Sequence, residues 1–136
     1  MATILEVSTD RHEQCIEITE GVRRVVRESG VREGLCHVMV LHATAAIIVN
    51  ENDDPNIGID LLRALRMTVA DHDDWLHDRI DNNAASHIKA SILGPSETLP
   101  IANGDLVLGR WQGIMLVELD GPRARRQTAI TILPAP

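Results

Sequence analysis

Three of the six histidines stand where an imidazole could bind a metal ion. His42 follows an apolar run in the string H-A-T-A-A, where its side chain would project from the end of a buried strand. His77 lies four residues before Asp81, so the two side chains share a face if that segment is helical. His87 belongs to the next predicted helix. Imidazole and carboxylate groups suit zinc or another divalent transition metal, and three such ligands plus water leave an open catalytic position.

A simpler interpretation stands beside the metal hypothesis. The chain has no H-E-x-x-H motif, and histidines are common at protein surfaces. His37 alternates into a predicted strand, which favours a core or interface position. His12 and His72 have polar neighbours, so we expect both in solvent.

Two cationic side chains are suited to phosphate. Arg123 follows the turn Asp120-Gly121-Pro122, and its guanidinium offers a planar fork of donors for phosphate oxygens. Lys89 is the only lysine, and helical spacing places it nearly opposite His87. A phosphate would therefore meet Lys89 across a boundary between two subunits. The simpler interpretations are a solvated helix lysine and a solvent-exposed arginine.

A Trp-Gln pair lies between two glycines in the string Gly109-Arg110-Trp111-Gln112-Gly113. The glycines would let the backbone and the indole ring approach a ligand closely, although a hairpin with a packed Trp fits equally well. The chain contains no phosphate-loop, dinucleotide-fingerprint or nucleophile-elbow motif. Their absence disfavours an ATPase, a Rossmann dehydrogenase and an α/β-hydrolase.

Charge and composition narrow the classes of partner. The 136 residues carry a formal net charge of −7, which argues against broad binding of nucleic acid or anionic membranes. Carboxylates crowd residues 51–81, where a solvated face is the usual interpretation and a cation site is the alternative. Cys15 and Cys36 lack metal or redox spacing and fit small buried thiols. With neither a signal peptide nor a membrane span in the sequence, we expect a cytoplasmic protein.

The elements that must position these residues are strands with three helices inserted among them. Periodicity predicts helices over residues 21–29, from Asp54-Pro55 to about residue 69, and over 84–93. Thr19 would cap the first helix, and an apolar stripe would follow the second at residues 57, 61, 65 and 69. Strand-like runs cover residues 3–8, 15–18, 35–41, 45–50, 98–102, 105–108, 113–119 and 126–133.

Turn signals complete the fold prediction. Asn103-Gly104 between two strand-like runs is typical of a tight hairpin, and Gly94-Pro95 ends the third helix. Residues 71–81 would form a polar loop or a short helix. The sequence therefore predicts a single α+β domain over residues 1–136, with helices inserted into a mostly antiparallel sheet system.

Four strings in this sequence resemble those of the YjbQ-like family and occur in the family's order. They are H-A-T-A-A-I-I-V-N-E-N-D-D-P at residues 42–55, N-N-A-A-S-H-I-K-A-S-I-L-G-P-S at 82–96, L-G-R-W-Q-G-I at 108–114 and L-D-G-P-R-A-R-R at 119–126. The resemblance implies an α+β domain with a β-sandwich-like core, assembled as a homotrimer with pockets near subunit boundaries. The implied pocket residues are His42, Asn50, Glu51, His77, Asp81, Asn83 and His87, with Trp111, Gln112 and Arg123 nearby.

The resemblance also implies an activity. Members of the family are described as secondary thiamine-phosphate synthases, which join hydroxymethylpyrimidine diphosphate to thiazole phosphate and release pyrophosphate. In that reaction the implied catalytic residues are His42, Asp81 and Glu51, and the implied metal ligands are His42, His77, His87 and Asp81. The small phosphorylated heterocyclic substrate would meet Lys89, Arg123, Asn50, Asn83, Trp111 and Gln112.

Two departures and one conflict bear on this expectation. Arg110 stands where the family commonly has a small hydroxylated residue, and Leu119 replaces the usual Phe before Asp-Gly-Pro-Arg. Diphosphate transfer usually employs magnesium, which prefers oxygen ligands, whereas histidines favour zinc or another transition metal. The alternatives are a metal-dependent hydrolase and a non-catalytic trimeric module that binds an anionic metabolite.

Overall fold

The strands form two antiparallel sheets, of five and three strands, in a computed structural model that describes residues 1–136. The larger sheet has the order β1 (Ala2–Val7), β8 (Arg126–Pro134), β3 (Gly34–Val40), β5 (Ser96–Ala102) and β6 (Asp105–Leu106). The smaller has the order β2 (Gln14–Glu17), β7 (Gln112–Glu118) and β4 (Ala45–Glu51). The helices are α1 (Thr19–Ser29), α2 (Asn56–Thr68), the short 3-10 helix η1 (Leu76–Arg79) and α3 (Ala84–Leu93). The predicted α+β class with antiparallel sheets is confirmed.

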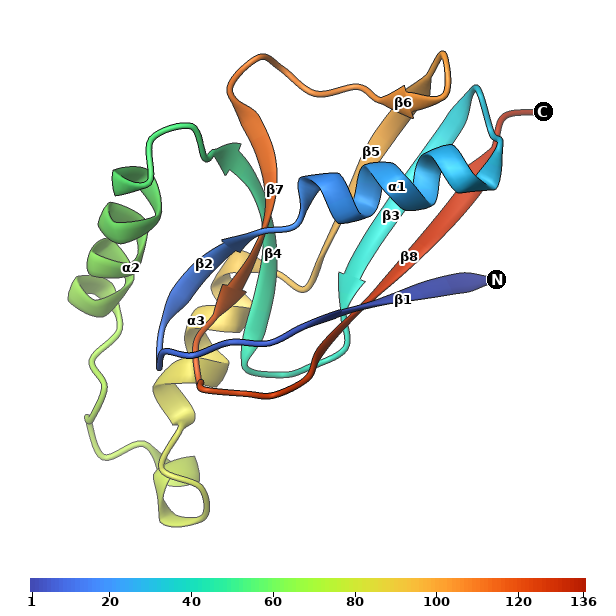
Figure 1. The fold of residues 1–136 in the computed structure, drawn as a ribbon. Coiled ribbons are helices and arrows are strands. Elements are labelled where there is room, and N and C mark those ends of the chain that lie inside the picture. The colour runs from blue at the N-terminus through green and yellow to red at the C-terminus, as the bar shows by residue number, and fades with distance from the viewer.

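Two cores lie on opposite faces of the three-stranded sheet. Figure 1 shows α1 crossing in front of the five-stranded sheet, and the first core fills the space between that sheet, α1 and the inner side of β4 and β7. Side chains of β7 alternate between the two cores, so that Ile114 and Leu116 join the first while Val117 joins the second, under α2 and α3. This double burial explains why β7 is continuously apolar rather than alternating.

The ends of the helices follow local chemistry. Gly30, with φ of 72°, ends α1 as predicted, because a left-handed residue costs glycine little. Thr19 is not the cap of α1; it is the first helical residue, and its hydroxyl accepts a hydrogen bond from the Ile114 N–H. Asp54 accepts one from the Asn56 N–H at the start of α2, but the N-cap is Pro55, so the start predicted from the Asp-Pro pair is one residue too early.

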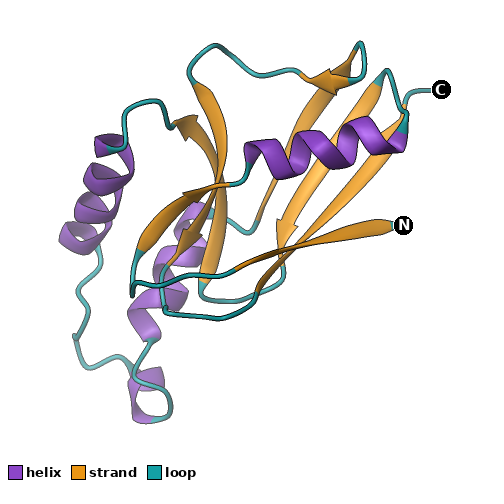
Figure 2. Ribbon diagram, in the orientation of Figure 1, coloured by secondary structure: helices purple, strands orange, loops and turns teal.

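The stripe predicted on the second helix is only partly correct. Leu65 and Val69 are buried, but the stripe passes through Gly58 and Leu62 rather than Ile57 and Leu61. A strict four-residue repeat drifts by about 40° per step around a helix, so it cannot stay on one face over three turns. Figure 2 shows α2 and α3 lying on the same side of the small sheet.

The Asn103-Gly104 hairpin is confirmed. It joins β5 to β6, with Ala102 opposite Asp105 and positive φ at Asn103 (54°) and Gly104 (81°). A two-residue turn with both φ values positive matches the right-handed twist of its strands. No helix in the structure has both the length and the apolar character needed to cross a membrane.

Candidate functional site

Two imidazoles meet between η1 and α3. The ring centroids of His77 and His87 lie 4.8 Å apart, edge to face at 89°. His77 Nε2 lies 3.7 Å from Asp81 Oδ2, and it is buried with no hydrogen-bond partner. The structure thus brings His77 into contact with His87 and close to Asp81, although these three expected metal ligands are not arranged around a common point.

The segment before α3 is folded back against it by specific hydrogen bonds. Asp78 Oδ1 accepts a bond of 3.0 Å from the Ala84 N–H, which satisfies a free donor at the start of α3. The Trp75 indole N–H donates to the Ala70 carbonyl at 2.9 Å. These two contacts hold η1, and with it His77, beside the first turns of α3.

A polar bridge connects the start of α3 to the turn after β7. Asn83 Nδ2 donates to Asp120 Oδ2 at 2.9 Å, and the same oxygen accepts from Arg123 Nη2 at 2.9 Å. The Arg123 side chain is half-exposed, so its guanidinium remains open to an anion. Asn83 Oδ1 is buried without a partner. The bridge therefore holds a half-exposed cation at the turn after β7 and leaves a buried, unpaired acceptor at the start of α3.

A buried ion pair lies behind that turn. The Glu118 and Arg126 side chains are 0% and 4% exposed, and they form two hydrogen bonds of 2.5 and 2.8 Å. Burial alone would raise the pKa of Glu118. The hydrogen bonds from Arg126, the Asp120 N–H and Thr9 outweigh burial, so the pKa lies below its ordinary value and Glu118 is ionised at neutral pH.

Thr9 joins the ion pair to the turn that carries Arg123. Its hydroxyl donates to Glu118 Oε2 at 2.9 Å and accepts from the Arg123 N–H at 2.8 Å. Gly121 fits this turn because a Cβ there would collide with the Arg11 carbonyl. The backbone of the Arg123 turn is thus fixed by the Thr9 hydroxyl and by the close approach of Gly121 to the Arg11 carbonyl.

His42 lies near this network rather than in the histidine pair. Its Nε2 accepts a hydrogen bond of 2.8 Å from the Gln127 N–H, which leaves the ring proton on Nδ1. Burial and the nearby charge of Arg126 lower its pKa, so the neutral form is favoured. No group of three His, Cys, Asp or Glu side chains in the chain is arranged to hold a metal ion.

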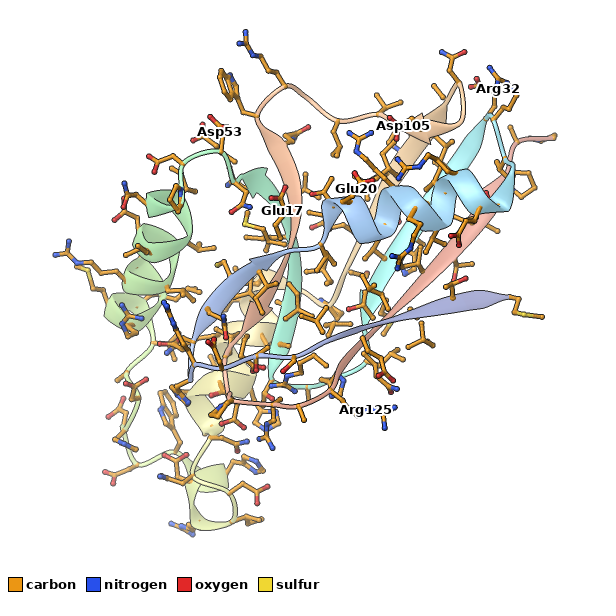
Figure 3. The ribbon with its side chains drawn as sticks, viewed as in Figure 1. Glu17, Glu20, Arg32, Asp53, Asp105 and Arg125 are labelled. Carbon is orange, nitrogen blue, oxygen red and sulfur yellow. The ribbon has the colours of Figure 1, made fainter.

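Four expected pocket residues lie at the other end of the small sheet. In the pairing of β4 with β7, Asn50 is opposite Gly113 and Glu51 is opposite Gln112. The seven residues of β7 span about 20 Å, so these side chains are distant from Arg123 beyond the far end of the strand. Figure 3 shows Asp53 and Glu17 at this end, away from η1. In a single chain, the residues of the pocket implied by the resemblance therefore lie in two separate groups.

The Trp-Gln segment at that end is turned toward solvent. Trp111 is 51% exposed, and the Arg110 guanidinium lies 4.6 Å from its ring centre. The Gln112 side chain accepts a bond from the Gly109 N–H at 2.7 Å, which closes the loop on itself. The interpretation of Trp111 as a packed hairpin residue is wrong for the isolated chain.

Lys89 is neither a surface residue nor an open cation. It is 2% exposed, and its Nζ lies 3.2 Å from both Glu13 Oε2 and Asp71 Oδ1. The solvated-lysine interpretation is therefore wrong. The opposite placement of Lys89 and His87 on α3 is as expected: Lys89 points to the interior and His87 toward η1.

Comparisons with known proteins identify the family to which the chain belongs. The model of the family described as "UPF0047 protein YjbQ-like" matches residues 3–135. The chain belongs to this UPF0047 family. A UPF0047 protein of Methanothermobacter thermautotrophicus is 43% identical over 90% of this chain and 85% of its own length. The UPF0047 protein YugU of Bacillus subtilis is 36% identical over 92% of this chain and 94% of its own length.

Solved structures of the UPF0047 family agree with the fold. A protein of Sulfolobus solfataricus, described as YbjQ-like and of unknown function, superposes with a TM-score of 0.95 at 38% identity, covering 99% of this chain and 97% of that one. An uncharacterised family member from Clostridium acetobutylicum gives 0.92 at 40% identity, covering 96% and 99%. These names state no activity, so the family is established and its reaction is not.

The structure also bears on the remaining histidines, the cysteines and the carboxylates of this UPF0047 chain. His12 and His72 are exposed, as predicted, whereas His37 is half-buried and hydrogen-bonded to Thr98. Both cysteines are free, and burial raises the pKa of each thiol to about 11, which fits inert thiols. The carboxylates of residues 51–81 are mostly exposed, as a solvated face requires.

The buried residues behind the Arg123 turn were missed by sequence reasoning. Glu118 ends an apolar strand and Arg126 begins another, positions that usually indicate surface charges. Their order in the chain carries no sign that the two charges meet in the interior. Only the spatial proximity of the β7 end to the β8 start makes them partners.

Proposed function

We propose that this UPF0047 protein is a metal-assisted enzyme acting on a phosphorylated heterocycle, with thiamine-phosphate synthase-like transfer as at least a side activity. The observation that supports it best is the His77–His87 pair, which lies beside the Asn83–Asp120–Arg123 bridge. Imidazoles without hydrogen bonds, on a helix whose start is bridged through Asp120 to a half-exposed arginine, suit a substrate with a nitrogen heterocycle and a phosphate.

The donor set fits a transition metal better than magnesium. His77, His87 and Asp81 supply two nitrogens and an oxygen, and the unpartnered Nε2 of His77 is a ready donor. Since no three side chains of the isolated chain are arranged to hold an ion, only part of this set would bind it as it stands, and water, substrate or a second copy would supply the remaining ligands. When bound, the ion would stabilise negative charge on the departing diphosphate.

The transfer itself breaks one bond and forms another. The carbon–oxygen bond between the pyrimidine methylene and the diphosphate breaks, and its electron pair leaves on pyrophosphate. The lone pair of the thiazole nitrogen forms the new carbon–nitrogen bond. Arg123 would bind phosphate oxygens, and Asp120 orients its guanidinium through Nη2 and Nε. Lys89 is left out of this phosphate site because two carboxylates already engage it.

A homotrimer would reunite the divided pocket residues. Asn50, Glu51, Trp111 and Gln112 lie at the opposite end of the small sheet from Arg123, so one chain cannot bring both groups to one substrate. A neighbouring copy could present its Trp111 end to the His77–His87 end of the next. In that arrangement Glu51 and Gln112 would act across the subunit boundary.

The test combines metal content with product release. We expect untagged protein to carry one transition metal per chain, lost in His87→Ala and retained in the control His37→Ala. Pyrophosphate release from the pyrimidine diphosphate should require the thiazole partner and fall at least tenfold in Arg123→Ala. Turnover of one substrate with water alone would replace the transferase by a hydrolase. Tight binding without any turnover would instead leave a non-catalytic module.

A further inference from the structure

A small pocket opens directly beside the histidine pair. Its volume is about 280 Å³, slightly below the roughly 300–1,000 Å³ typical of drug-sized ligands. It is therefore sized for one ring with short substituents. Its lining residues are Trp75, Leu76, His77, Ala84, His87 and Ile88.

The walls of the pocket are apolar and partly fixed. The indole of Trp75 is held by its hydrogen bond to the Ala70 carbonyl, so that wall is preorganised. Ala84 and Ile88 are four residues apart on α3 and form one continuous strip. No carboxylate, arginine or lysine lines the pocket, which makes it unsuitable for a phosphate group.

The only polar groups of the lining side chains, apart from the tethered indole N–H, are the two imidazoles. His87 is half-buried, and neither of its ring nitrogens is engaged in a hydrogen bond, whereas Nε2 of His77 is enclosed and contributes no accessible polar surface. Aromatic and imidazole rings favour stacking or edge contacts with a flat ring. An open apolar depression with the His87 imidazole at one side suits a planar ring that carries a nitrogen atom able to hydrogen-bond to His87.

We propose that this pocket is the subsite for the uncharged planar nitrogen heterocycle of the substrate, of the size of an aminopyrimidine. The phosphate would lie outside, toward Arg123, because Asn83 directly precedes Ala84 and is bridged to Arg123 through Asp120. This inference rests on the proposed function for its substrate class. It adds Trp75, Leu76 and Ile88 as residues that select the ring.

The composition of the chain permits a direct test. Trp75 and Trp111 are the only tryptophans, and there is no tyrosine, so the variant Trp111→Phe makes Trp75 the sole emitter. The probe is 4-amino-5-hydroxymethyl-2-methylpyrimidine, the ring without its phosphates. We expect a saturable change in Trp75 emission, weakened at least tenfold in apparent Kd by Ile88→Asp. The matched control Ile92→Asp, an exposed change on the same helix, should leave the apparent Kd unchanged.

The readout separates this inference from the proposed function, because binding is measured without turnover. A saturable Trp75 response in a protein that never releases pyrophosphate would support the subsite and sink the transferase. Turnover with no Trp75 response would overturn the subsite alone. The subsite would also be overturned if Trp75 emission did not respond to the probe but changed with protein concentration. A second copy of the chain would then cover the pocket. Circular dichroism of Ile88→Asp checks that the variant folds.

Discussion

Glu118 and Arg126 are charged side chains enclosed where a small protein usually buries only apolar groups. Desolvating two charges is costly, and replacing such pairs by apolar residues is often neutral for stability. Stability alone therefore does not explain the pair. Their hydrogen bonds to Thr9 and the Asp120 N–H instead tie them to the turn that carries Arg123. At the scale of residues, the buried Glu118–Arg126 pair therefore fixes the turn that carries Arg123.

The Glu118 carboxyl should make stability fall in acid. Its folded-state pKa is lowered, so the stability it contributes is complete above its ordinary value of 4.5 and is lost as pH falls through the folded pKa. The variant Glu118→Gln leaves Arg126 buried and unpaired, and should lose about 3–5 kcal/mol at neutral pH. Urea unfolding between pH 7 and pH 3 measures both effects.

A matched control is the exposed Glu6–Arg125 pair. Glu6→Gln should lower the free energy of unfolding far less than Glu118→Gln does, because surface pairs are screened by water. If Glu118→Gln kept the full acid sensitivity of the wild type, the assignment of that sensitivity to Glu118 would be wrong.

At the scale of elements, α3 organises both the interior and the candidate site. One face of the helix is buried through Ala85, Lys89 and Ala90, while His87 and Ile88 face the small pocket. Lys89 reaches Glu13 in the loop before β2 and Asp71 in the loop before η1. A single ammonium group thus links three segments that are far apart in the sequence.

Removing that ammonium should loosen the segment that carries His77. Lys89→Met leaves Glu13 with only Arg66 as a partner, and should destabilise the fold by about 3–5 kcal/mol. Hydrogen exchange should rise most in residues 70–83, since Asp71 loses its anchor. The control Arg63→Met changes an exposed side chain of α2 and should leave exchange in 70–83 unchanged. If hydrogen exchange in Lys89→Met rose equally across the whole chain, Lys89 would not be a local anchor of residues 70–83.

At the scale of the whole molecule, one face of the five-stranded sheet has no helix over it. Its outward side chains include several apolar residues that are between 39% and 53% exposed: Ile4, Leu35, Met39 and Leu133. Leu35 and Met39 lie on β3 and Leu133 lies on β8, and these two strands are paired over seven residues. Ile4 on β1 is opposite the same β8 residue as Met39, so the four side chains lie on one continuous surface. Such a patch is typical of a contact between protein molecules.

If the proposed homotrimer uses this face, a charge placed there should dissociate it. Wild-type protein should elute with the mass of three chains in light scattering, and the double variant Leu35→Lys/Met39→Lys should shift toward one chain. Glu28→Lys, an exposed change on α1, is the control and should leave the mass unchanged. A wild type that elutes as a single chain would contradict the trimer itself.

Much of the fold was accessible from the sequence, because its signals are local. Gly30 ends α1, Asn103-Gly104 makes the hairpin, and residues 84–93 form α3 with the bounds that Gly94-Pro95 predicts. These features depend on backbone conformations and on side chains one or two turns away. The η1 helix and the position of the apolar stripe on α2 were harder to predict, because tertiary packing rather than helix propensity decides them.

The sequence by itself determined the family, the α+β class and the side chains available for chemistry. It also placed His77 four residues before Asp81, which was sufficient to bring them within 3.7 Å. Tertiary structure decided which distant groups meet. It buried Lys89 between two carboxylates, joined Glu118 to Arg126, and placed Glu51 and Gln112 about a strand length from Arg123. The physical reason is that strand pairing and core packing, which act between residues far apart in the chain, set these distances.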